Sequence, residues 1–168
     1  MRKVILNLAV TLDGYIVGPN GEYDWCYSDQ DYGMTDFMKR TDAIFFGRRS
    51  YEVLVGTDQN PYPEKKKYVF SRSMKSAAGA QIIGDNYIKE VMEIKNQPGK
   101  DIWLFGGASL TASVMNAQLV DELQLSIHPI LLGKGKPLFQ GLKDWIKFTF
   151  IDTKKYSTGL VQLFYRLD

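Results

Sequence analysis

Apolar residues along the chain fall into short runs that alternate with amphipathic stretches, and this alternation predicts strands and helices in turn. Residues 4–12 are apolar and β-branched and end at Asp13-Gly14, which is typical of a buried strand followed by a turn. Residues 87–95 have the apolar spacing of a helix and stop before Pro98-Gly99. By the same criteria we expect strands at 43–46, 68–70, 81–83 and 102–105, and helices at 35–40, from 47 onward and at 109–116.

The pattern changes in the last third of the chain, where long apolar stretches are joined by turns that contain glycine. Strands are expected over residues 119–132, 146–155 and 160–167, and such neighbours suit antiparallel pairing. Strands that alternate with helices, followed by strands alone, indicate a three-layer α/β/α fold whose mixed sheet is mostly parallel, with antiparallel C-terminal strands. With 168 residues and no internal repeat or linker, residues 1–168 are expected to form a single domain.

Composition narrows the partners and the cellular environment. Lys and Arg number 21 against 19 Asp and Glu, so charge gives no reason to expect nucleic acid or an anionic membrane as a partner. No stretch approaches the roughly 20 apolar residues that a membrane helix needs. Cys26 is the only cysteine and His128 the only histidine, so neither a disulfide nor a metal site is expected. A reducing cytoplasm fits this composition.

Residues 19–32 form a long polar and aromatic segment without a helix or strand pattern. Segments of this length in compact domains are usually functional or disordered, and the aromatic residues here favour an ordered one. Trp25 and Tyr27 either stack on a flat heterocycle or cap the core. His128 precedes Pro129 within an apolar strand and is expected to be a core or edge residue rather than a catalytic base.

Two strand ends carry residues that could bind an anion. In open α/β sheets, ligands bind beyond the carboxyl ends of the strands, where the N–H groups at helix starts point outward. The stretch FFGRRSYE offers Gly47 for a tight turn, with Arg48 and Ser50 as polar groups. The stretch VFSRS brings Ser71 and Arg72 directly after a strand, a pair suited to a phosphate group. The alternatives are ordinary helix capping and a surface turn.

A third strand end, WLFGGASL, carries two adjacent glycines. Because Gly106 and Gly107 lack Cβ atoms, a pyrophosphate could lie against the backbone and accept from the N–H groups of Ala108 and Ser109. Entry of a strand into a helix explains the glycine pair equally well. The stretch lacks the G-x-G-x-x-G spacing, so an ordinary Rossmann dinucleotide site is not expected.

The order of VTLDGYI, FFGRRSYE, VFSRS, LFGGASL and LVDELQLSIHPILLGKGKPLF resembles the dihydrofolate reductase superfamily. Within it, the chain is most similar to bacterial proteins related to the reductase domain of riboflavin biosynthesis, from residue 4 to residue 167. The resemblance implies NADPH bound across the carboxyl edge of the sheet, and a cis peptide bond between the two glycines. It implies phosphate contacts at Gly47, Arg48 and Ser50, 2′-phosphate contacts at Ser71 and Arg72, and pyrophosphate contacts at Gly106, Gly107, Ala108, Ser109 and Leu110.

The substrate side departs from the family pattern. The riboflavin-pathway reductases carry Glu immediately before the glycine pair, whereas this chain has Phe105. Folate reductases place a carboxylate on the first helix, and no carboxylate of this chain aligns with it without a gap. The expected substrate contacts are Trp25, Tyr27, Asp29 and Phe105, and the end of the first strand, from Ala9 to Ile16, is expected to wall the pocket and contact the cofactor.

Asp13 is the candidate proton donor, and its alternative role is to form the Asp-Gly turn. The expected activity is NADPH-dependent reduction of a small heterocycle, a riboflavin-pathway pyrimidine or a pterin-like compound. The alternative is a non-catalytic nucleotide-binding protein that has kept the fold. A homodimer through the C-terminal strands is also expected, since their apolar residues exceed what one sheet face readily buries: Phe148, Phe150, Leu160, Val161, Leu163 and Phe164.

Overall fold

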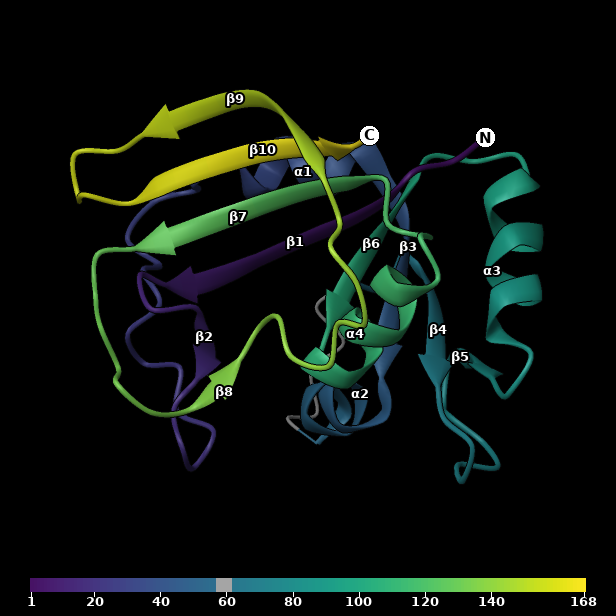
Figure 1. Cartoon of the computed structure of the whole chain (residues 1–168). Coiled ribbons are helices and arrows are strands. Elements are labelled where there is room, and N and C mark those ends of the chain that lie inside the picture. The colour runs from purple at the N-terminus through teal and green to yellow at the C-terminus, as the bar shows by residue number, and fades with distance from the viewer. Residues whose placement is uncertain (57–61) are drawn as a thin grey trace.

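Strands from eight places in the chain pair into one sheet in the computed structural model, which describes residues 1–56 and 62–168 (Figure 1). They are β1 (Val4–Thr11), β3 (Thr41–Gly47), β4 (Lys66–Phe70), β5 (Ala80–Ile83), β6 (Asp101–Gly106), β7 (Glu122–His128), β9 (Phe148–Lys155) and β10 (Val161–Leu167). Their order is β5-β4-β3-β6-β1-β7-β10-β9. All neighbours from β5 to β7 are parallel, and β10 runs antiparallel to both β7 and β9. The expected mixed sheet with antiparallel C-terminal strands is confirmed.

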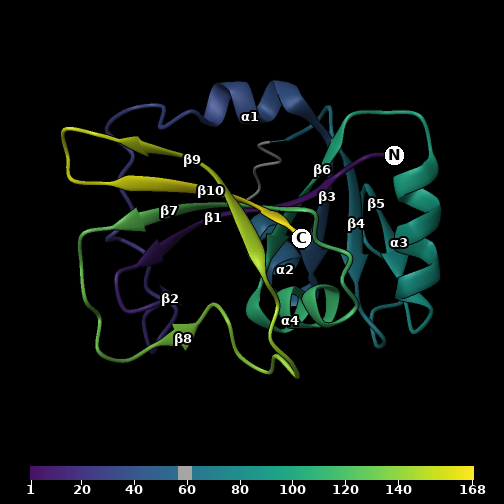
Figure 2. The ribbon, with the colours of Figure 1, turned by 45° about the horizontal axis from the view of Figure 1, so that its top comes forward.

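Helices cover both faces of the sheet. They are α1 (Met34–Arg40), α2 (Arg48–Val55), α3 (Tyr87–Asn96) and α4 (Ala108–Asn116). Phe37 of α1 and Tyr51 of α2 pack on one face, while Val91 of α3 and Val114 of α4 pack on the other. Figure 2 shows α1 and α4 on opposite sides of the strands, so the three-layer arrangement holds. No helix in the described ranges is both long and apolar enough to cross a membrane.

The continuous apolar run of β1 follows from its central place in the sheet. Val4 and Leu6 face the layer of α3 and α4, whereas Ile5 faces the layer of α1 and α2. All three side chains are fully buried, because a parallel strand with helices on both faces meets no water. This arrangement sends the carboxyl end of β1 to the same edge of the sheet as those of β3, β4, β5 and β6.

β7 is shorter than the strand expected over residues 119–132. Leu119 and Val120 are buried, yet they lie in a turn after α4, where the Leu119 N–H donates to the Val114 carbonyl at 3.0 Å. The strand stops at His128 because Pro129 has no N–H to donate to a neighbouring strand. Apolar character alone did not distinguish buried turn residues from strand residues here.

A separate two-stranded ribbon lies beside the main sheet, and the sequence pattern did not predict it. β2 (Tyr15–Val17) pairs antiparallel with β8 (Lys136–Pro137), as Figure 1 shows at the lower left. A Cβ on Gly135, whose φ is +149°, would lie 2.3 Å from the Val17 carbonyl oxygen, so glycine is required there. Strands of two and three residues carry too little period-two pattern to be recognised.

The segment before α1 is ordered by polar contacts with the C-terminal strand. Gln162, which is buried in β10, donates from Nε2 to the Tyr32 carbonyl at 2.8 Å and to the Ser126 hydroxyl at 3.1 Å. Its Oε1 accepts from the Tyr156 hydroxyl at 2.9 Å, and the Tyr156 ring packs edge-on against that of Tyr32. Gln162 therefore fixes the end of the aromatic segment to the sheet.

Candidate functional site

The ends of four parallel strands open onto one cavity. Gly47 ends β3, Phe70 ends β4, Ile83 ends β5 and Gly106 ends β6. A cavity of about 550 Å³ lies over them and over the first turns of α2 and α4. The three strand ends singled out in the sequence therefore meet at one place. The cavity is lined by Gly47, Arg48, Arg49, Ser50, Phe70, Ser71, Arg72, Ser73, Ile83, Gly84, Asp85, Tyr87, Gly107, Ser109, Leu110, Ser113 and Lys136.

Two backbone segments meet closely beneath the cavity. A Cβ on Gly47 would lie 3.3 Å from both the Gly106 carbonyl oxygen and the Gly107 nitrogen, tighter than side chains normally pack. Glycine at the end of β3 thus allows β6 to approach. The Gly106-Gly107 peptide bond is cis, as the family resemblance implied, and Gly106 has a φ of +104°. Both features direct the chain from β6 into α4.

A small recess lies beside Gly107. A Cβ there would be 3.6 Å from Ser50 Oγ and 4.0 Å from Lys136 Nζ, with no other atom nearer than 4 Å outside its own chain neighbours. The recess is therefore bounded by a hydroxyl, an ammonium group and the first turn of α4. Hydrogen-bond donors around a recess at a helix start suit an anion.

Thr111 presents a polar atom without a partner beneath this junction. Its side chain is 1% exposed, and the described residues offer its Oγ1 no hydrogen bond. The hydroxyl lies 3.6 Å from the position that a Cβ on Gly106 would take. Buried hydroxyls are usually satisfied, so this atom is unusual, although Thr111 is not among the residues that line the cavity.

The charge around the cavity is mainly positive. Arg48, Arg49, Arg72 and Lys136 line it, with Asp85 as the acidic residue among the lining groups. Arg48 donates to the Ser73 hydroxyl at 3.1 Å, which holds its guanidinium at the rim. Arg72 is 86% exposed, and its Nε lies 3.6 Å from Asp85 Oδ1. Guanidinium groups that surround a cavity of this size suit a ligand with several phosphate groups.

Ser71 shapes the turn that carries Arg72. Its Oγ accepts from the N–H groups of Ser73 at 3.3 Å and Met74 at 3.0 Å, while its own N–H donates to the Ile83 carbonyl at 3.0 Å. The Ser71 hydroxyl keeps its proton for a ligand, since both contacts use its oxygen as an acceptor.

The structure gathers most of the residues expected to bind the cofactor. Gly106 and Ala108 are buried next to the cavity rather than lining it. Ala9 on β1 and Ile16 on β2 are half-buried and lie outside the lining set. The remaining expected residues line the cavity directly: Gly47, Arg48, Ser50, Ser71, Arg72, Gly107, Ser109 and Leu110.

The expected substrate residues do not line this cavity. Phe105 packs between Phe46 and Trp103, with ring centroids 4.9 and 5.0 Å away, in the layer that faces α1 and α2. Asp29 accepts a hydrogen bond from the Tyr32 hydroxyl at 2.6 Å. These side chains lie on other surfaces near the carboxyl edge, so the structure separates them from the cationic cavity.

Trp25 and Tyr27 pack against His128 at the end of β7. Their ring centroids lie 5.2 and 5.0 Å from the imidazole, both in edge contacts, and the Tyr27 N–H donates to His128 Nε2 at 3.1 Å. Nδ1 lies 3.0 Å from the Ser126 carbonyl, so the neutral ring carries its proton on Nδ1. Burial lowers the pKa of His128. In the described part of the chain, the buried Trp25 Nε1 has no acceptor.

Asp13 joins two loops through its carboxylate. Oδ1 accepts from the Thr11 hydroxyl at 2.6 Å and the Leu132 N–H at 3.2 Å, and Oδ2 accepts from the Gly133 N–H at 2.7 Å. The Thr11 hydrogen bond, supported by those backbone donors, lowers the pKa of Asp13. These contacts favour the turn-forming alternative, and a role as proton donor stays a prediction.

Sequence reasoning missed Lys136, Asp85 and Tyr87 as lining residues. Asp85 and Tyr87 follow β5, so the rule that ligands bind beyond strand ends could have found them. Lys136 had no such signal, because it reaches the cavity only through the β2–β8 ribbon.

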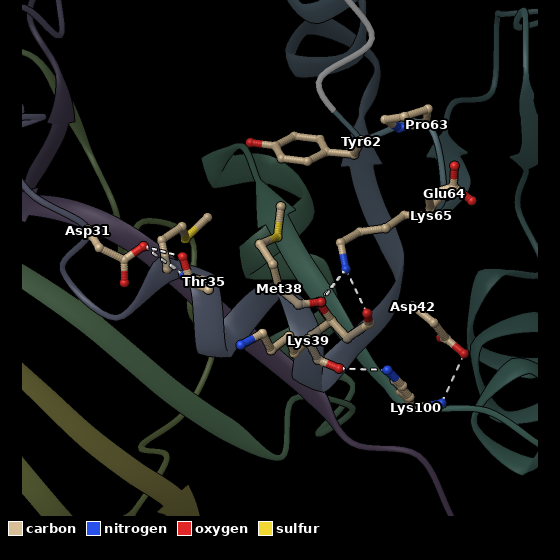
Figure 3. A pocket seen from close by; sticks show the side chains of 12 residues that line it. Asp31, Thr35, Met38, Lys39, Asp42, Tyr62, Pro63, Glu64, Lys65 and Lys100 are labelled. Atoms are coloured by element: carbon tan, nitrogen blue, oxygen red, sulfur yellow. Dashed lines mark hydrogen bonds between the residues drawn. The ribbon is translucent and has the colours of Figure 1, made fainter.

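A second cavity, of about 610 Å³, lies beside α1 (Figure 3). Lys65 Nζ donates there to the Met38 and Thr41 carbonyls at 2.8 and 2.6 Å, and Lys100 Nζ donates to the Lys39 carbonyl at 2.8 Å. These ammonium groups cap the C-terminal end of α1, where the last carbonyls lack helical partners. Lys65 and Lys100 therefore have a structural role in this cavity.

The chain has a dihydrofolate reductase-like α/β fold, with a cis Gly-Gly bond after β6 and a cationic cavity over the strand ends. The chain matches the RibD C-terminal domain over residues 2–162, and it belongs to that family. The resemblance drawn from the sequence motifs is confirmed.

The chain is similar to one curated relative in sequence and to two solved structures in fold. It is 47% identical over 177 residues to the uncharacterized protein YyaP of Bacillus subtilis (strain 168), covering 98% of this chain and 94% of that protein. A solved structure described as a candidate riboflavin biosynthesis protein from Shewanella sp. PV-4 is 24% identical, with a TM-score of 0.88 over 100% of this chain and 99% of that chain. Dihydrofolate reductase from Enterococcus faecalis, solved with NADP(H) and RAB-propyl, is 15% identical, with a TM-score of 0.71 over 99% of this chain and 96% of that chain.

Proposed function

We propose that this chain is an NADPH-dependent reductase of a small heterocyclic substrate, either a riboflavin-pathway pyrimidine or a pterin-like compound. The observation that carries the proposal is the cationic cavity over four strand ends, with a recess at Gly107 where a side chain would otherwise lie. Membership of the RibD C-terminal domain family and the NADP(H)-bound reductase of the same fold support it.

The residues of the cavity fit the phosphate groups of such a cofactor. Ser50 and the first N–H groups of α4 surround the recess at Gly107 and would bind the pyrophosphate. Arg72 and the Ser71 hydroxyl, one strand end further along, would bind the 2′-phosphate. When bound, NADPH supplies the hydride, and the protein supplies position and exclusion of water.

The substrate is proposed to lie beyond this cavity, towards the aromatic segment. Trp25 offers a buried indole N–H that needs an acceptor, and the carbonyl groups of pyrimidines and pterins are acceptors of this kind. Phe105, held between two aromatic rings, would provide an apolar wall in place of the carboxylate of related reductases. Tyr27 and Asp29 complete the proposed substrate contacts.

Two measurements test this proposal. Titration of the purified chain with NADPH should show saturable binding, followed by oxidation of NADPH when the correct pyrimidine or pterin is added. Binding without oxidation across pyrimidines, pterins and flavins would instead support a non-catalytic nucleotide-binding protein, the alternative that Phe105 favours. Failure to bind any nicotinamide nucleotide would contradict the proposed reductase.

A further inference from the structure

Lys136 places an ammonium group at the inner end of the cavity. It lies on β8, where it pairs with Val17, and its Nζ is 4.0 Å from the position of a Cβ on Gly107. The side chain is half-buried, and within residues 1–56 and 62–168 its ammonium has no hydrogen bond or ion pair. This cation therefore stands next to the first turn of α4 without an acidic neighbour to bind it.

The backbone on either side of Lys136 is held in place. Gly135 passes so close to the Val17 carbonyl that a side chain there would clash, and the Leu138 N–H donates to the Gly14 carbonyl at 2.9 Å. The preceding loop is fixed by Asp13, which accepts from two of its N–H groups. The ribbon thus presents Lys136 towards the recess at Gly107.

The position of the Lys136 ammonium is electrostatically unfavourable without an anion. The N-terminus of a helix carries partial positive charge, so an ammonium group beside it is repelled unless an anion lies between them. Ser50 adds a further donor to the same recess. The three groups together form a site for a doubly charged oxyanion, with donors from a ribbon and from two helices.

We propose that Lys136 is a phosphate-binding residue that contacts the pyrophosphate of the nicotinamide nucleotide, and this rests on the proposed function. Arg72 also lines the cavity, just after the end of β4, and is suited to the 2′-phosphate. Lys136 therefore contributes affinity for NADPH and NADH alike, because both carry a pyrophosphate. Arg72 contributes only to the preference for NADPH.

The test compares Lys136→Ala, Lys136→Arg and the control Lys134→Ala in direct binding titrations. Lys134 is an exposed lysine two residues away that does not line the cavity. Its replacement by alanine changes the net charge by the same amount and so controls for long-range electrostatics. Lys136→Ala should raise the Kd for both NADPH and NADH about tenfold, the effect of losing one charged hydrogen bond. Lys136→Arg should retain most of the affinity, Lys134→Ala all of it, and inorganic pyrophosphate should compete less well with the Lys136→Ala variant.

Thermal unfolding of the ligand-free variants separates binding from folding. Lys136→Ala should unfold at the same temperature as the wild type or slightly higher, because a repelled charge has been removed. Equal nucleotide affinity in Lys136→Ala and Lys134→Ala would overturn the proposal for Lys136. Weak binding together with a lowered unfolding temperature would overturn it too, since the lysine would then be structural. A wild-type chain that binds neither nucleotide would instead refute the proposed function.

Discussion

The guanidinium of Arg72 and the carboxylate of Asp85 face each other at the ends of β4 and β5, with Nε 3.6 Å from Oδ1. Both side chains are more than four-fifths exposed, so this ion pair contributes little to stability. Its significance is electrostatic. Asp85 lowers the positive potential at this end of the cavity, and it would compete with the proposed 2′-phosphate for the same guanidinium.

Substitutions of this pair should change cofactor preference in opposite directions. Arg72→Ala should weaken NADPH binding by about tenfold or more and leave NADH binding nearly unchanged, because only NADPH carries a 2′-phosphate. Asp85→Asn should strengthen NADPH binding. Titrations at low and high salt measure both, and the wild-type preference for NADPH should fall as salt rises. Equal loss of both cofactors in Arg72→Ala would assign the residue to the turn instead.

The two glycines after β6 should respond differently to alanine. Gly107→Ala adds a methyl group at ordinary van der Waals distance from Ser50 and Lys136, so it should leave stability nearly unchanged while weakening nucleotide binding. Gly106→Ala must take a φ of +104°, which costs on the order of 1–3 kcal/mol for a residue with a Cβ. Urea unfolding and cofactor titration on the same samples measure both effects. An unfolded Gly107→Ala variant would show that the position serves helix entry alone.

Asp13→Asn separates a structural role from a catalytic one. If Asp13 chiefly holds the Leu132 and Gly133 N–H groups, the variant should lose stability modestly, and its kcat should stay near the wild-type value. The lowered pKa of Asp13 also means that its contribution to stability is present above pH 4 or so and lost as pH falls through the lower folded value. A kcat that collapses at unchanged stability would establish Asp13 as the proton donor.

Acidification should loosen the contact between the aromatic segment and β7. Burial lowers the pKa of His128, so as the pH falls through about 6.5 the imidazole of the unfolded chain is protonated before that of the folded chain. Stability should therefore be intact above pH 7 and fall as pH decreases through 6.5, by at most about 1.4 kcal/mol per pH unit from this group. The His128→Gln variant keeps an acceptor for the Tyr27 N–H, and its urea-unfolding profile should be flatter over that range.

A homodimer through the C-terminal strands stays a prediction, now with fewer candidate contacts. Leu160 is buried in its own chain and Phe148 packs against its own core, so neither is available. Phe150 and Ile151 are 55% and 49% exposed on β9, which forms an open edge of the sheet. Light scattering should give the mass of two chains at micromolar concentration, and Phe150→Lys should shift it towards one.

The alternation of strands and helices could be predicted from the sequence because most strands here are buried on both faces. Residues 102–105 and 43–46 had to be apolar throughout, and glycines marked where those strands enter helices. The elements that escaped prediction were short or were set by distant contacts. β2 and β8 together contain only five residues, and their pairing depends on Gly135 passing beside Val17.

The same contrast holds for the site. Gly47, Arg48, Ser71 and Arg72 could be found because position after a strand is a local signal. The unsatisfied Thr111 hydroxyl could not, since a threonine in a helix has no sequence mark that distinguishes a bonded side chain from an orphaned one. Lack of a partner is a property of the packed structure alone.

The β2–β8 ribbon also bears on the order in which the molecule assembles and opens. Asp13 reaches donors that lie 119 and 120 residues further along the chain, so these contacts close a long loop and are expected to form late in folding. Two-stranded ribbons have little stability of their own, and units of this kind open by local fluctuation well before global unfolding. Amide hydrogens of the ribbon should exchange with solvent deuterium sooner than those of β1, and each opening would carry Lys136 away from Gly107. The residence time of a nucleotide would then follow the opening rate of the part of the fold that forms last.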